Sequence, residues 1–368
     1  MNTKKLGSLF ALVASASLVA CGGGGSDSSS AAAAPALGIP ASPAPAPVPA
    51  LIPAPAVNPD LVTSVTLPTY AAGTPEKGGW DLLMAQRSTC GFGLLQQDTR
   101  LDVASEAHSN YLVQNSLRLL GTAVGHFEDP TYPFFTGNAP GDRATAAGYN
   151  GNVFEILAIR SILTFSVGQQ FTVDEALGAT SMRDLIETVY HARGAFWAGR
   201  SGGIGAVAGF GPAAQSGVTQ SQYRITSEIS SEANAQKLGT STVASFPCNG
   251  TVGINGTFAP ATESPNPFPS ITDTAVKYGT PLYFKADEGS SLVITTGTVT
   301  KVSDGSALTL SQLNKANDPA AEITSNEVFL VPTSALAKAS SYSVHVVGTV
   351  NGTPFTKDLT FSTAPSTE

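Results

Sequence analysis

The first half of the chain has apolar residues at the spacing of amphipathic helices. Residues 80–87 predict a short helix, Asp98 fits the N-cap of a second helix, and Thr172-Val173-Asp174-Glu175 fits the capping box of a third. Residues 203–209 and 222–230 are short apolar stretches that predict buried strands. Helices interleaved with strands in this way favour a layered core of the α/β type.

The second half of the chain has the alternation that is typical of strands. Polar and apolar residues alternate over residues 341–346, and Asn351-Gly352 separates this run from a second one, which is a strong hairpin signal. About 100 residues of short strands with such turns predict a small β-sandwich. Prolines return over residues 260–269 and mark a linker. We therefore expect one domain at residues 60–258 and a second at residues 259–368.

The N-terminus has the features of a lipoprotein leader. Two lysines precede a short apolar stretch, and Leu18-Val19-Ala20-Cys21 resembles a bacterial lipobox. We predict a signal peptide at residues 1–20 and lipidation of Cys21; the alternative is an ordinary cleaved signal with an incidental cysteine. Residues 21–59 are rich in Gly and Ser and then in Pro and Ala, which predicts an extended tether. The lipid would hold the protein at the cell envelope, with the outer membrane as the expected location.

The net charge of the chain limits the classes of partner that it can bind. Of the 368 residues only 12% are charged, and 27 acidic against 19 basic residues give a net charge of −8. Such a chain repels a phosphate backbone, so nucleic acid is excluded as a partner. No apolar run is long enough for a membrane-spanning helix in the mature protein, so the expected membrane contact is the N-terminal lipid anchor alone.

The cysteines allow one bridge. Apart from Cys21 the sequence has only Cys90 and Cys248. An even pair in an oxidising compartment favours a disulfide between them, and two separate buried thiols are the alternative.

Two histidines and a glutamate form the candidate site. His126 lies in a predicted loop, Glu155 begins an apolar stretch, and His191 ends the third predicted helix. A carboxylate among apolar residues needs a partner, and two imidazoles from other segments could supply one. The three side chains could form a zinc-like site with an open position or a general acid/base pair. His108, on the apolar face of its helix, is expected to be a core histidine that takes no part.

Seven pieces of sequence occur in an order that is typical of one extracellular family. They are Arg87 to Leu95, Leu101 to His108, Gly125-His126, Asp142 to Tyr149, Glu155-Ile156, Tyr190-His191 and Gly203-Ile204-Gly205. In this order residues 80–235 resemble a bacterial member of the CAP superfamily (cysteine-rich secretory proteins, antigen 5 and pathogenesis-related 1). The resemblance implies an α+β fold in which an α-β-α sandwich is followed by a small all-β, Ig-like sandwich.

The same resemblance implies a cleft with histidines and acidic residues. The family's two histidines correspond to His126 and His191, and the first glutamate corresponds to Glu155. The second acid is missing from its usual position, and both Glu187 and Glu128 are candidates for it.

Three functions follow from this interpretation. We expect a non-enzymatic extracellular binding module whose cleft takes a divalent metal such as zinc or a small ligand, for example a lipid or another envelope component; no cofactor is certain. A structural or adhesive protein that acts through the Ig-like domain is the first alternative. The second is a metal-dependent hydrolase of an envelope polymer, with Glu155 as the base.

Overall fold

The computed structural model describes residues 60–118, 125–164, 170–213 and 217–365. The predicted signal peptide, Cys21 and the tether lie outside these ranges. The described residues belong to one compact unit, Ala56–Glu368. None of the helices in this part of the chain is both long and apolar enough to cross a membrane.

The described fold is mostly β, and the expected α-β-α sandwich followed by an Ig-like sandwich is wrong. The described residues form three four-stranded sheets and five α-helices, with 33% of residues in strands and 21% in helices. Two of the sheets are mixed. In the first, β1 (Gln96–Gln97) pairs in parallel with β3 (Ser201–Pro212), and in another β6 (Thr251–Ile254) pairs in parallel with β12 (Thr353–Thr363). Alternation along a sequence predicts strands but not their partners, so these pairings had no local signal.

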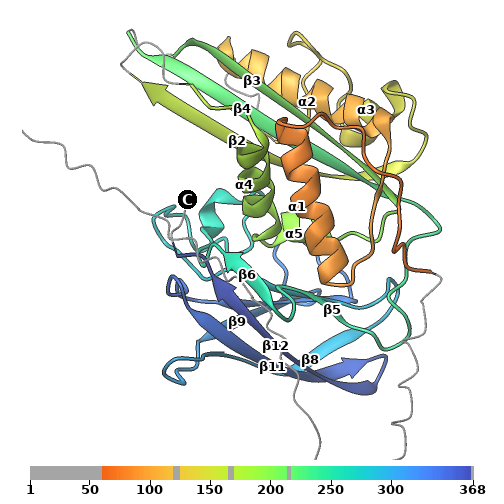
Figure 1. The fold of residues 1–368 in the computed structure, drawn as a ribbon, viewed down its shortest axis with the longest axis vertical. Coiled ribbons are helices and arrows are strands. Elements are labelled where there is room, and N and C mark those ends of the chain that lie inside the picture. Colours follow the sequence, from red (N-terminus) through yellow and green to blue (C-terminus); the bar gives the residue numbers. More distant parts are fainter. Residues whose placement is uncertain (1–59, 119–124, 165–169, 214–216, 366–368) are drawn as a thin grey trace, which may run out of the picture. The chain divides into compact units, whose positions relative to one another are not determined.

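The first sheet has the order β1-β3-β4-β2 (Figure 1). Both β3 and β2 (Asn152–Thr164) pair antiparallel with β4 (Thr219–Ser231), which is buried along almost its whole length. The strands predicted at residues 203–209 and 222–230 are confirmed as parts of β3 and β4; the second is buried as predicted, whereas the first is buried only over residues 203–205. Since β2 pairs with β4 on one side only, its other side is an edge of the sheet.

Five helices accompany this sheet, and α2 packs on β3 and β4 (Figure 1). They are α1 (Pro75–Thr89), α2 (Thr99–Leu117), α3 (Pro140–Ala146), α4 (Glu175–Ile186) and α5 (Tyr190–Ala195). Asp98 caps α2 as predicted, because its side chain accepts a 3.0 Å hydrogen bond from the Arg100 N–H. The cap of α4 is Asp174, two residues after the predicted Thr172. His191 lies in α5 rather than at the end of the helix that precedes it.

Helices α1 and α4 cross at a pair of glycines. A Cβ atom on Gly78 would lie 1.9 Å from the Glu175 carbonyl oxygen, and one on Gly178 would lie 1.9 Å from the Pro75 carbonyl oxygen. Only glycine allows the two backbones to come this close. This contact fixes the position of α4, whose C-terminal end contributes to the cavity described below.

The other two sheets have the orders β5-β7-β10-β9 and β6-β12-β11-β8. Their remaining strands are β5 (Ala244–Phe246), β7 (Leu282–Lys285), β8 (Leu292–Lys301), β9 (Leu310–Asn314), β10 (Glu327–Pro332) and β11 (Ser341–Val350). The predicted hairpin is confirmed: β11 pairs antiparallel with β12, and Asn351 and Gly352 have φ values of 51° and 80°. Strands β5 and β6 precede residue 259, so each of these sheets includes a strand from before the proline-rich segment.

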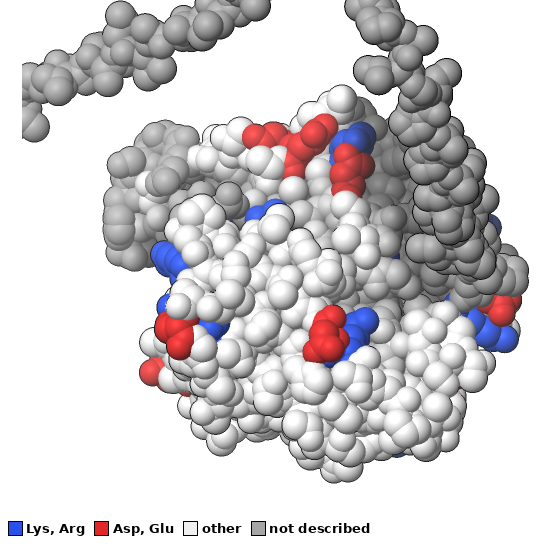
Figure 2. All heavy atoms as spheres, turned by 60° about the horizontal axis from the view of Figure 1, so that its bottom comes forward, with Lys and Arg blue, Asp and Glu red and all other residues white. Residues whose placement is uncertain are grey.

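Charged side chains are sparse on the face of the molecule that Figure 2 shows. They stand in small groups, in several of which acidic and basic side chains are neighbours, and uncharged residues cover the surface between them (Figure 2). This distribution follows from the 12% share of charged residues in the sequence.

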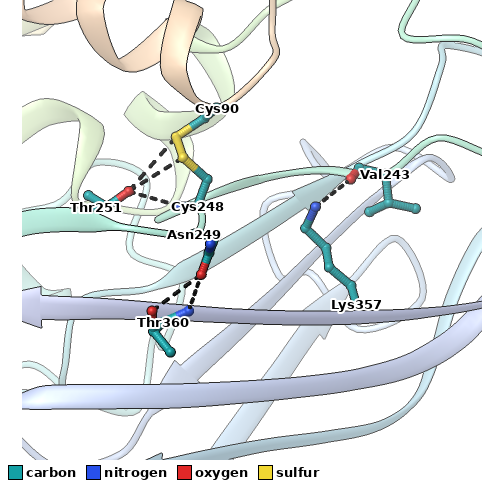
Figure 3. The surroundings of a disulfide bond; sticks show 7 residues. All are labelled: Cys90, Val243, Cys248, Asn249, Thr251, Lys357 and Thr360. Carbon is teal, nitrogen blue, oxygen red and sulfur yellow. Dashed lines mark hydrogen bonds between the residues drawn. A yellow bond between two sulfur atoms is a disulfide. The ribbon is translucent and has the colours of Figure 1, made fainter. Parts of the chain in front are cut away.

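The predicted disulfide is confirmed and joins α1 to the segment between β5 and β6 (Figure 3). Cys90 is the C-cap residue of α1, and its Cα atom lies 5.3 Å from that of Cys248. The next residue, Asn249, accepts a 3.0 Å hydrogen bond from the backbone N–H of Thr360 on β12. The disulfide therefore connects the helical half to the last strand of the fold through very few residues.

Candidate functional site

A cavity of about 530 Å³ is lined by both predicted histidines. Its walls come from the loop that carries His126, from residues 157–160 of β2, from residues 184–191 at the junction of α4 and α5, and from residues 255–264. The apolar side chains among them are Leu157, Ala158, Ile159, Leu185, Phe258 and Ala259. Polar side chains such as Arg160, Asp184, Glu187 and Asn255 line the rest of the wall, so the cavity combines an apolar patch with polar groups, as many ligand sites do.

His126 is held in place by a buried ion pair. Its Nδ1 atom lies 2.9 Å from Oε1 of Glu155, and Nη2 of Arg143 donates a 2.6 Å hydrogen bond to Oε2 of the same carboxylate. The guanidinium also donates a 3.1 Å hydrogen bond to the His126 carbonyl oxygen. A carboxylate beside Nδ1 favours the tautomer with the proton on that nitrogen, which leaves Nε2 of the neutral ring as an acceptor.

Glu155 is ionised because the positive and hydrogen-bonding groups beside its carboxylate lower its pKa by more than burial raises it. Burial alone would raise the pKa of the carboxyl group, but His108, His126 and Arg143 outweigh that effect and lower the pKa below its usual value. His108 is fully buried, with Nδ1 2.9 Å from Oε1 of Glu128 and Nε2 3.7 Å from Oε1 of Glu155. His108 is a core histidine, as expected, and it does not line the cavity, but its ring faces Glu155 and helps to keep that carboxylate ionised.

His191 has a carboxylate of its own, which the sequence analysis missed. Its Nδ1 atom lies 3.2 Å from Oε1 of Glu263 and 3.0 Å from Oγ1 of Thr188. The same carboxylate accepts hydrogen bonds of 3.1 and 2.6 Å from the N–H groups of Val189 and Tyr190, so it also anchors the start of α5. Glu263 is 72 residues beyond His191, in the proline-rich segment interpreted as a linker, where no local signal indicates a site.

The two imidazoles are near neighbours across the cavity wall. Their ring centroids lie 6.5 Å apart, at an interplanar angle of 40°. The side chain of His126 is 30% exposed and that of His191 is 16% exposed, whereas the carboxylates of Glu155 and Glu263 are almost completely buried. Each ring is thus held at Nδ1 from the protein side.

The two candidates for the second acid lie in different places. Glu187 lines the cavity, where Oε2 accepts a 2.8 Å hydrogen bond from the Asn255 N–H. Burial raises the pKa of Glu187 to about 8, so at pH 7 its carboxyl group is mostly neutral. Glu128 does not line the cavity: besides His108 it accepts a 2.7 Å hydrogen bond from the Thr136 N–H and holds the loop that carries His126. The acid that contacts His191 is neither of these.

A further buried carboxyl group stands beside Glu155. Glu228 on β4 is the register partner of Glu155 on β2, and neither of its carboxyl oxygens has a hydrogen-bond partner in the described structure. Burial, and then the negative charge of Glu155, raise the pKa of Glu228 to about 9. Because Glu228 stays protonated, only Glu155 of these two neighbouring carboxyl groups carries a negative charge, and Arg143 balances that one charge.

The described side chains do not fit the zinc-like site that the sequence suggested. Among the described residues no group of three or more His, Cys, Asp or Glu side chains could hold a metal ion. A zinc site needs at least three protein ligands. Both oxygens of Glu155 are already engaged, one by His126 and the other by Arg143, so only the two imidazole nitrogens remain.

Comparison with known proteins adds no relative. No protein-family model matches the chain, and no curated protein sequence matches it. The resemblance to the CAP superfamily stays a prediction, and the function has to be argued from the geometry of the cavity.

Proposed function

We propose that this protein is a binding module whose cavity takes a ligand at the Nε2 atoms of His126 and His191. One observation carries the proposal: each histidine has a buried carboxylate at Nδ1, Glu155 for one and Glu263 for the other. The two rings come from separate segments, and each is held at Nδ1. His126 has a hydrogen bond to Glu155 there, whereas His191 has one to Thr188, with the carboxylate of Glu263 3.2 Å away. Both rings are therefore arranged to offer Nε2 to a ligand.

The surroundings of the two rings define the chemistry of the ligand. A neutral imidazole accepts a hydrogen bond at Nε2, so the ligand should carry a donor group such as an N–H, a hydroxyl or an ammonium. The mostly neutral Glu187 adds a polar group that can both donate and accept. The apolar wall formed by Leu157, Leu185 and Phe258 favours a ligand with an apolar body.

Binding is favoured over hydrolysis because of the state of Glu155. A general base must reach the water molecule or proton that it abstracts. The carboxylate of Glu155 is almost completely buried, is not among the residues that line the cavity, and is held by Arg143 at 2.6 Å. The predicted lipid on Cys21 would tether this binding module to the envelope.

The four histidines of the chain allow a direct test. We would label the purified full chain with ¹⁵N-histidine, assign the ring signals with one variant for each histidine, and titrate separately with octylammonium chloride, 1-octanol and a pool of random dodecapeptides. His345 is the internal control, because its Nδ1 also faces a carboxylate, that of Asp358 at 2.6 Å, but on an exposed sheet surface.

The proposal expects at least one of these probes to shift the Nε2 signals of both His126 and His191 and to leave His345 unchanged. The shift should saturate, and the His126→Ala and His191→Ala variants should each weaken binding of that probe about tenfold. If no probe moves the two cavity histidines, or if His345 moves to the same extent, the proposal is wrong.

A further inference from the structure

We propose that the ligand of the cavity is an extended polypeptide segment that pairs with the free edge of β2. This inference rests on the proposed function, since it names the class of ligand that would lie beside His126 and His191. It is carried by the backbone of β2, whose unpaired side forms part of the cavity wall.

The register of the sheet shows which groups of β2 point to the free side. On β3 the backbone N–H groups of Ile204 and Ala206 donate hydrogen bonds to side chains outside the sheet. These N–H groups therefore point away from β4. Backbone groups alternate in direction along an antiparallel pair. Their register partners on β4, Ser227 and Ile225, therefore direct their own backbone groups toward β2.

The alternation continues across β4 to β2. Ser227 and Ile225 are partners of Ile156 and Ala158, which consequently form the hydrogen-bonded pairs with β4. The residues between and beyond them on β2 direct their N–H and C=O groups to the free side. They are Leu157, Ile159 and Ser161, and no hydrogen bond to these outward groups is found in the described structure.

This edge has few of the features that normally keep a strand edge from pairing. β2 has 13 residues and contains neither proline nor lysine; its two charged residues, Glu155 and Arg160, are paired with Arg143 and Asp184. The side chains of Ile159 and Leu163 on β2 are 42% and 66% exposed, so they leave apolar surface beside the edge. Natural proteins usually shorten, charge or cover such an edge, because it binds any extended chain that can reach it. An edge with these outward backbone groups at Leu157, Ile159 and Ser161 favours pairing with a partner strand.

The backbone pattern of the β2 edge and its place in the cavity wall indicate which kind of ligand binds there. Donors and acceptors repeat every second residue along β2, and only another extended polypeptide backbone repeats them at the same interval. Residues 157–160 lie in the cavity wall together with His126 and His191, so a segment on this edge would pass both imidazoles.

The experiment compares two substitutions at one position. A phage-displayed library of random dodecapeptides is panned on the purified full chain, and the peptide that is enriched most is synthesised for fluorescence anisotropy. Ile159→Pro removes an outward N–H without removing a hydrogen bond to β4, and Ile159→Val keeps that N–H in a side chain of similar size. We expect the proline variant to bind the peptide about fivefold more weakly or worse than the wild type. The valine variant should change the affinity by less than about twofold.

A second measurement leaves the protein unaltered, in case the proline variant is misfolded. Peptides methylated at one backbone nitrogen at a time lose affinity at every second position, because only alternate N–H groups face β2. Failure to enrich any peptide, equal affinities for the proline and valine variants, or methylation effects without a period of two would overturn the inference. Dimerisation through β2 without peptide binding would overturn it as well.

The two proposals fail in different ways. If octylammonium or 1-octanol shifts the signals of His126 and His191 while no peptide meets the criteria above, the binding function stands and the polypeptide inference falls. If an enriched peptide pairs with β2 but His126→Ala and His191→Ala leave its affinity unchanged, and no probe moves either histidine, the proposed function falls. In that case β2 is an interaction edge independent of the histidines, and the inference fails as a statement about the cavity ligand.

Discussion

Glu187 should make the protein less stable as the pH rises toward neutrality. Its pKa is raised from 4.5 to about 8 by burial beside the cavity, so the folded protein keeps this carboxyl group protonated over most of that interval. The unfolded chain ionises the same group near pH 4.5 and is favoured by doing so. The stability associated with Glu187 is therefore fully present below about pH 4.5 and declines until the pH reaches about 8.

The size of this effect follows from the two pKa values. At pH 7 the unfolded chain has gained the free energy of ionisation over about 2.5 pH units, and each unit corresponds to about 1.4 kcal/mol. Ionisation therefore costs the fold about 3 kcal/mol at pH 7. Glutamine has nearly the same shape and keeps an oxygen for the Asn255 N–H, but it does not ionise. We expect Glu187→Gln to be about 3 kcal/mol more stable than the wild type at pH 7 and nearly equal to it at pH 4.

Urea unfolding at each pH from 4 to 8, followed by tryptophan fluorescence, measures this difference. Other buried groups also titrate, so the informative quantity is the variant minus the wild type at each pH. Glu106→Gln is the matched control, because Glu106 is exposed on α2. Parallel stability curves for Glu187→Gln and the wild type would show that Glu187 is ionised in the folded protein, and the reasoning would be refuted.

Three further variants test how the fold is held together. Replacing Cys90 and Cys248 by Ala should lower the free energy of unfolding by about 5 kcal/mol in the chain-entropy model, because the disulfide closes a loop with a sequence separation of 158; urea unfolding under oxidising conditions checks this. Arg143→Met should cost about 3–5 kcal/mol by leaving Glu155 buried without its cation, and adding Glu155→Gln should recover part of that loss in thermal unfolding; an unchanged cost would contradict the pairing. Gly178→Ala should cost about 1–3 kcal/mol by pushing α4 away from α1, and a melting temperature equal to that of the wild type would disprove the close contact.

Two kinds of feature could be predicted from the sequence. Some depend only on residues close together in the chain, and others have very few possible pairings. The Asp98 cap depends on a side chain and an N–H two residues away, and the Asn351-Gly352 turn depends on two residues that tolerate positive φ. The disulfide had only one possible pairing once Cys21 was set aside. Each of these predictions is confirmed.

The features that could not be predicted depend on contacts between distant segments. Glu263 reaches His191 only because the chain returns across the junction of α4 and α5 after 72 residues, and nothing near residue 263 indicates this. Arg143 pairs with Glu155 across a loop whose path no periodicity describes. The mixed sheets, which make the expected α-β-α and Ig-like architecture wrong, likewise depend on the partners of strands rather than on their existence.

The parallel pairing of β6 with β12 has a consequence for how the protein is made. The ribosome synthesises β6 about 100 residues before β12, so β6 has no partner on this side until those residues have followed it. During that interval β6 offers an unpaired edge to other chains. A premature stop that deleted little more than the 11 residues of β12 would make this state permanent, and the truncated product should be degraded or aggregate although almost all of its sequence is present.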